Sequence, residues 1–140
     1  MAVAPEPIES RNQIADLVHR YAYNVRHRLT NESKGLLCHD IEFVVRERKM
    51  GGGNEPTVRS HVYGKAETLD YIRRSSATLA LCPLIHNLLI DIDGLTARST
   101  CVMENRTWPA IPGMIGEYDD TFRFEDRWRF ASRVYTIFVD

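Results

Sequence analysis

The sequence is poor in cysteine, and its few cysteines form no pattern typical of a disulfide framework or a zinc site. Cys38, Cys82 and Cys101 are the only three in 140 residues, and no CxxC pair occurs. Histidine and cysteine also never recur at the spacing of zinc ligands. We therefore expect reduced, partly buried thiols in a cytoplasmic protein without a zinc site.

Long apolar runs are missing as well. No stretch approaches the roughly 18 consecutive apolar residues that span a membrane. The N-terminal sequence MAVAPEPIES lacks a basic segment followed by an apolar one, which a secretion signal would need. These absences predict a protein that is not exported and has no membrane partner.

The chain has no excess of charge of either sign. Eighteen Lys and Arg face nineteen Asp and Glu, for a formal net charge of −1. No basic stripe interleaved with aromatic residues occurs, so we expect no nucleic-acid partner. What the chain does have is arginine, which accounts for fifteen of the eighteen cations. Arginine pairs bidentately with carboxylates and stacks on aromatic rings, which predicts internal ion pairs or anionic ligands.

The length fits one compact domain. Residues 1–9 contain two prolines and are predicted to form a disordered tail, with a single domain over residues 10–140. Ser10 is the predicted N-cap of a first helix, with Gln13 as its capping-box partner. The helix carries an apolar stripe at spacings of three and four, formed by Ile14, Leu17, Val18, Tyr21 and Val25.

A second helix of about four turns is predicted after Gly64, and strands dominate the rest of the chain. The expected strands are 41–48, 84–91, 96–104, 115–124 and 128–138, and the last four form two hairpins. Helices first and hairpins last is the order of an α+β protein, with helices packed on one face of an antiparallel sheet. Such a sheet must curl around the helices to cover its own apolar face.

Four segments together resemble the SnoaL-like branch of the nuclear-transport-factor-2-like superfamily. They are RNQIADLVHRYAYNV, LLCHDIEF, HNLLIDIDGLTARSTCV and GEYDDTFRFEDRWRFASRVY, and the resemblance covers about residues 8–138. It implies a cone-shaped, cystatin-like fold with about three N-terminal helices on a strongly curved antiparallel sheet that encloses a pocket. It further implies a small hydrophobic ligand and a homodimer, with a trimer as the other assembly seen in such proteins.

The relatives include polyketide cyclases, scytalone dehydratase and a dehydrochlorinase. In the latter two kinds of relative, an Asp near the end of the first helix orients a His that removes a proton from the substrate. When the sequence is matched to that pattern, Arg26 falls at the Asp position and Pro83 at the His position. Arg26 cannot act as a base because its guanidinium stays protonated. It is predicted either to bind an anion in the pocket or to mark a pocket without base catalysis.

The remaining candidates for chemistry are His86 and Tyr118. His86 could replace the missing base, but strand alternation places it opposite to position 83 unless a bulge intervenes. The alternative is an ordinary histidine bonded to a neighbouring strand. The matching tyrosine of relatives faces the pocket, and the phenol of Tyr118 could donate a hydrogen bond to a carbonyl or a developing oxyanion. Its alternative is a core tyrosine.

Other residues are predicted to line the pocket because the matching positions do so in relatives. They are Phe43, Cys101, Met103 and Met114. Core packing alone would account for them equally well, since a pocket wall has the composition of a core face. Arg133 and Asp119, on the last hairpin, are predicted to form a cross-strand or interface ion pair.

Two functions remain open at this point. One is a lyase, isomerase or cyclase that acts on an apolar ring compound without metal or organic cofactor, with Tyr118, His86 and Arg26 in its site. The other is a non-catalytic ligand-binding or dimerisation module. The loss of the Asp and His favours the module, whereas Tyr118 and the polar end of the first helix favour the enzyme.

Overall fold

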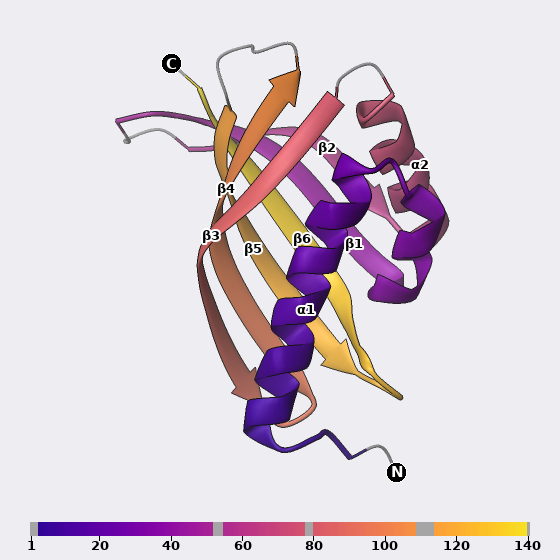
Figure 1. Ribbon diagram of the computed structural model, residues 1–140. Coiled ribbons are helices and arrows are strands. Elements are labelled where there is room, and N and C mark those ends of the chain that lie inside the picture. Colours follow the sequence, from indigo (N-terminus) through magenta and orange to yellow (C-terminus); the bar gives the residue numbers. More distant parts are fainter. Residues whose placement is uncertain (1–2, 52–54, 78–79, 109–113, 140) are drawn as a thin grey trace.

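The computed structural model describes residues 3–51, 55–77, 80–108 and 114–139 (Figure 1). Its elements are two α-helices, one 3₁₀ helix and six strands. In chain order they are α1 (Pro7–Arg26), η1 (Thr30–Leu36), β1 (Leu37–Lys49), β2 (Thr57–Tyr63), α2 (Lys65–Ser75), β3 (Ala80–Asp93), β4 (Thr96–Trp108), β5 (Met114–Phe124) and β6 (Trp128–Val139). The described helices include none that is long and apolar enough to cross a membrane.

Helix α1 begins at Pro7, three residues before the predicted N-cap Ser10, so part of the predicted tail is helical. Proline suits the first helical position because its φ is already helical and its missing N–H needs no partner there. Ser10 lies inside the helix, fully buried, and its hydroxyl donates to the carbonyl of Pro5 at 3.1 Å. The predicted apolar stripe does face the core.

The six strands form one open sheet in the order β2-β1-β6-β5-β4-β3. Strands β1 and β6 pair in parallel and the other four pairs are antiparallel, so the predicted all-antiparallel sheet is wrong. The reason is that the C-terminal strand β6 enters between β5 and the much earlier β1, in the same direction as β1. Strand β2 was not predicted, because this edge strand is mostly exposed and lacks an alternating apolar pattern.

Helix α2 ends at Ser75, earlier than the four turns that the sequence predicted. At its end the hydroxyls of Ser75 and Ser76 donate back to the carbonyls of Tyr71 and Ile72, both at 2.8 Å. Pro83 lies within β3. Proline is tolerated there because β3 is an edge strand.

The helices lie on one face of the sheet, and the α+β class is confirmed (Figure 1). Helix α1 packs mainly on β3 and also on β6, whereas α2 packs on β1 and β2. The core fills the space between helices and sheet. Its fully buried apolar side chains include Ile14, Val18, Ile41 and Phe130.

A charged pair is buried within this core. The Arg133 guanidinium donates to both Asp120 carboxylate oxygens, at 2.7 and 2.9 Å, and the two side chains are 1% and 0% exposed. The predicted partner Asp119 instead pairs with Arg98 on the outer face. Strand alternation explains this correction, because neighbouring residues of β5 point to opposite faces.

Aromatic rings surround the buried guanidinium. Its carbon atom lies 3.6 Å from the ring centre of Tyr118, 4.3 Å from that of Tyr21 and 4.6 Å from that of Phe130. Cations are attracted to the faces of aromatic rings, most strongly where water is excluded. Rings and carboxylate together replace the water that the charge loses on burial.

We expect Asp120→Asn to destabilise the protein strongly. The substitution keeps the shape of the side chain but leaves the Arg133 charge buried and unpaired, which costs about 3–5 kcal/mol. Urea unfolding followed by circular dichroism measures the loss. Asp119→Asn removes an exposed pair in the same strand and should cost far less. Equal losses in the two variants would contradict the role given to the buried pair.

Candidate ligand-binding site

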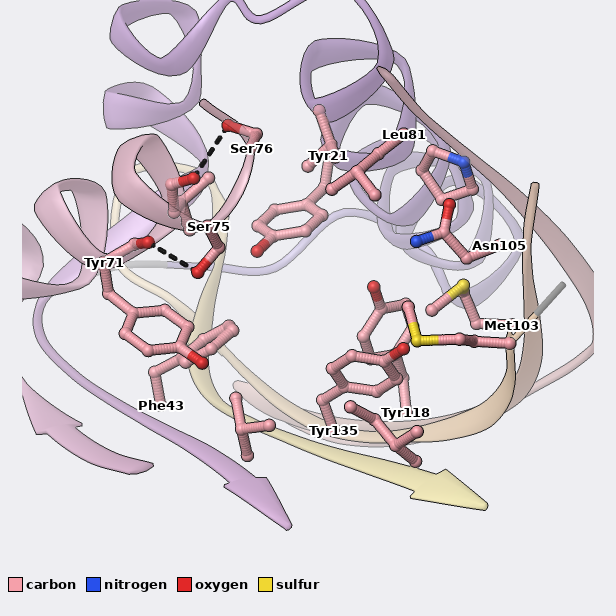
Figure 2. Close-up of a pocket in the computed structure, with 16 residues that line it drawn as sticks. Tyr21, Phe43, Tyr71, Ser75, Ser76, Leu81, Met103, Asn105, Tyr118 and Tyr135 are labelled. Atoms are coloured by element: carbon pink, nitrogen blue, oxygen red, sulfur yellow. Dashed lines mark hydrogen bonds between the residues drawn. The ribbon is translucent and has the colours of Figure 1, made fainter. Parts of the chain in front are cut away.

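A cavity of about 200 Å³ lies between the two α-helices and the sheet (Figure 2). Its wall is mostly apolar, with four tyrosines, two serines and one asparagine among its side chains. The lining residues are Tyr21, Val25, Phe43, Val45, Tyr71, Ile72, Ser75, Ser76, Leu81, Pro83, Met103, Asn105, Met114, Tyr118, Tyr135 and Ile137.

Simple periodicity places these side chains in one wall. Tyr21 and Val25 are one helical turn apart in α1, so they share a face. In the strands, every second residue faces the cavity, as with Met103 and Asn105 in β4. Neighbouring strands bring such positions together, and Tyr118 of β5 lies directly opposite Tyr135 of β6.

The tyrosine hydroxyls are the main polar groups of the cavity. Figure 2 shows the hydroxyls of Tyr21, Tyr71 and Tyr118 directed toward the same open space. The rings of Tyr118 and Tyr135 lie with their centres 5.0 Å apart. The Tyr135 hydroxyl is buried and has no hydrogen-bond partner in the described part of the chain. A buried polar group without a partner is costly, so this hydroxyl is a site where a ligand atom would be stabilising.

Burial keeps these phenols protonated. It raises the pKa of Tyr21 to about 12, and the positive charge of Arg133 only partly opposes that rise. The same two effects raise the pKa of Tyr118 well above its usual value, and burial also raises the pKa of Tyr135. At neutral pH the three hydroxyls are therefore neutral and can donate hydrogen bonds, but they are not bases.

Asn105 was not predicted, although it lies two residues after Met103 on the same strand face. It is 5% exposed, and its Oδ1 accepts the backbone N–H of Cys82 at 3.1 Å. Figure 2 shows its Nδ2 directed toward the open space. Extending the alternation of β4 by one step beyond Met103 would have found this residue.

Arg26 lies outside the cavity wall. Its guanidinium donates to the Cys82 sulfur at 3.1 Å and is exposed. Among the described residues it therefore neither reaches into the cavity nor forms an ion pair with a carboxylate at the cavity mouth. Pro83, which the resemblance places at the histidine position, does line the cavity but has no polar side-chain atom.

His86 also lies outside the cavity. Its side chain is 50% exposed, and its Nε2 is 3.4 Å from a carboxylate oxygen of Glu104 on the neighbouring strand. A bulge does occur in β3, with Asn87 at a φ of 52°, but it follows His86 and does not turn it inward. This is the arrangement of a histidine bonded to a neighbouring strand.

Of the other residues predicted to line the pocket, four do so and one does not. The cavity wall includes Phe43, Met103, Met114 and Tyr118, whereas Cys101 is buried and does not line it. Burial raises the pKa of the Cys101 thiol to about 11, so this cysteine is unreactive at neutral pH.

The described part of the cavity wall contains no carboxylate, imidazole or ammonium group. The described residues also include no group of three or more His, Cys, Asp or Glu that could hold a metal ion. The chemistry available at the wall is therefore hydrogen bonding by neutral groups and contact with apolar and aromatic surface.

Comparison with solved structures agrees with this fold. A candidate dehydratase of the NTF2-like family from Streptomyces avermitilis matches with a TM-score of 0.77 and 13% identity, over 96% of this chain and 100% of its own. A candidate scytalone dehydratase from Novosphingobium aromaticivorans matches with a TM-score of 0.73 and 18% identity, over 93% and 85%. LinA matches with a TM-score of 0.75 and 16% identity, over 93% and 86%. At such identities the likeness shows the fold alone.

The sequence comparisons give the family. No curated protein matches the chain. The family model described as the SnoaL-like domain matches residues 6–134, nearly the whole chain, which confirms the resemblance inferred from the sequence. The protein therefore belongs to the family of SnoaL-like domains.

Proposed function

We propose that the protein binds a small, largely apolar ring compound in this cavity and that tyrosine hydroxyls donate hydrogen bonds to an oxygen atom of that compound. The observation that carries the proposal is the buried, unpartnered hydroxyl of Tyr135 beside Tyr118 in a mostly apolar wall. Pockets for small molecules combine an apolar lining with a few placed polar groups in this way.

The size of the cavity limits the ligand. An apolar cavity of about 150 Å³ in a protein takes up benzene. The cavity of about 200 Å³ is somewhat larger and suits a compound of one or two rings. The rings of Phe43 and the tyrosines offer faces and edges on which such a ligand can pack.

The same donors support a catalytic role. Neutral donors held in place in a dry site stabilise an oxygen on which negative charge develops, as in the enolate of a ketone. We therefore extend the proposal to a cofactor-independent isomerisation, elimination or cyclisation of the bound ring compound, with Tyr118 as the donor. Water or the substrate itself would have to accept the proton, because the described wall offers no base. The non-catalytic alternative predicts binding without turnover.

Tyr118→Phe tests the hydrogen bond. With 1-indanone as the probe, we expect the variant to bind about fivefold more weakly, which corresponds to about 1 kcal/mol for one hydrogen bond. Indane has the same rings without the oxygen and should bind both proteins equally. Tyr63→Phe alters an exposed tyrosine of β2 and is the matched control. Isothermal titration calorimetry gives the dissociation constants, and equal affinities of the three proteins for 1-indanone would argue against the proposal.

We expect binding of 1-indanone to be independent of pH between about 5 and 9. The raised pKa values of Tyr21 and Tyr118 mean that the donor protons are lost only as the pH rises above 10. No carboxylate or imidazole of the described wall titrates in the tested range. A titration midpoint near pH 6 in the dissociation constant would show that an ionisable group takes part.

We also propose a homodimer through the sheet face that carries no helix (Figure 1). Val44 and Val134 are paired neighbours there, pointing away from the cavity, and both are only partly buried in the single chain. Apolar side chains on an uncovered face are typical of subunit interfaces.

Light scattering after size-exclusion chromatography checks this assembly. We expect twice the chain mass of 16.1 kDa for the wild type and the monomer mass for Val134→Glu, because a charge in an apolar interface opposes association. Asn12→Glu adds the same charge at an exposed position of α1, on the other side of the sheet, and should keep the wild-type mass. A wild type that elutes at the monomer mass would contradict the proposal.

A further inference from the structure

The proposed function does not say which class of oxygen-containing ligand the cavity prefers. The position of Asn105 indicates this class. We infer that Asn105 is the specificity-determining residue of the cavity and that its Nδ2, together with the hydroxyl of Tyr118, donates to one carbonyl oxygen of a ring ketone. This inference rests on the proposed function and names the class of ligand.

The orientation of the Asn105 amide follows from its surroundings. In the register of β3 and β4, Asn105 lies opposite Pro83, which has no N–H to donate to the neighbouring strand. The preceding N–H, of Cys82, donates instead to the Asn105 Oδ1. A rotation of the amide by 180° would place NH₂ against this N–H, two donors facing each other. The NH₂ group is therefore held on the side of the cavity.

The Nδ2 of Asn105 lacks an acceptor of its own. The described residues provide no hydrogen bond to it. Although the residue as a whole is 5% exposed, Nδ2 is not one of the fully buried unpartnered atoms, so a small molecule in the cavity can reach it. An acceptor brought by a ligand would complete the pairing.

The Tyr118 hydroxyl is placed so that it and the Asn105 amide can bind the same ligand oxygen. In Figure 2 the Asn105 Nδ2 and the Tyr118 hydroxyl face the same open space. A carbonyl oxygen has two lone pairs and can accept from both groups. The site therefore favours a ketone over the corresponding hydrocarbon.

Asn105→Asp separates this role from a structural one. The new carboxyl group has nearly the same shape and still accepts the N–H of Cys82, but when ionised it has no proton to donate. We expect the preference of the wild type for 1-indanone over indane to fall at least tenfold in this variant at pH 8. As the pH is lowered and the carboxyl group becomes protonated, its O–H can donate, and the preference should return. The wild-type preference should not change over the same pH range.

Dissociation constants for 1-indanone and indane, measured by calorimetry from pH 5 to 8, provide the test. A second comparison uses Tyr118→Phe alone and combined with Asn105→Asp. If both groups bind one oxygen, the two losses should not add.

Three outcomes would overturn the inference. An unchanged, pH-independent preference for 1-indanone in Asn105→Asp would show that Asn105 serves only to bind the Cys82 backbone, and the proposed function would stand. If the wild type bound neither 1-indanone nor indane, the proposed function would itself fail. Equal affinity of the wild type for both probes would leave the cavity as an apolar site and would reject both the tyrosine hydrogen bond and the role of Asn105.

Discussion

The buried pair of Arg133 and Asp120 is the constraint on which the cavity depends. A guanidinium can be buried only if a carboxylate and polarisable surfaces replace its hydration. Asp120 provides the carboxylate, and the rings of Tyr21, Tyr118 and Phe130 provide the surfaces. Because Tyr21 and Tyr118 also line the cavity, the buried ion pair holds two of the hydroxyl-bearing side chains of its wall in place.

This arrangement makes the cavity chemically neutral. The charges of the buried pair bind each other beneath the tyrosines, and the described wall itself carries no ionised side chain. What faces the ligand space is a set of protonated phenols, one amide and apolar side chains. In the proposed function, such a site discriminates by shape and by the presence of a hydrogen-bond acceptor. The resemblance found in the sequence places Arg26 and Pro83 where the dehydratase relatives have Asp and His, so we do not extend the chemistry of that pair to this cavity.

Pro83 has a further structural consequence. A proline in the edge strand leaves one position of the ladder without a donor, and the side chain of Asn105 binds the neighbouring N–H instead. The proline thus goes together with an amide that points its NH₂ group into the cavity (Figure 2).

Much of the fold was predictable from the sequence, because periodic burial leaves a periodic pattern. The stripe of α1, the two hairpins and the α+β class follow from local spacing, and the family follows from the order of four segments. The exposed strand β2 and the parallel pairing of β1 with β6 left no such pattern. Phe43, Met103 and Tyr118 were placed at the pocket by the resemblance. Asn105 was missed although it lies one alternation step beyond Met103, and the direction of its amide depends on a proline in another strand.

The sequence by itself determined the class of fold and the family, since these depend on residue identity and local order. Only the tertiary structure decided which charges are buried together and which polar atoms face the cavity. Arg133 binds Asp120 and not Asp119, and Arg26 and His86 lie outside the wall. The physical reason is that a side chain's partner is set by strand register and direction, which bring together residues far apart in the chain.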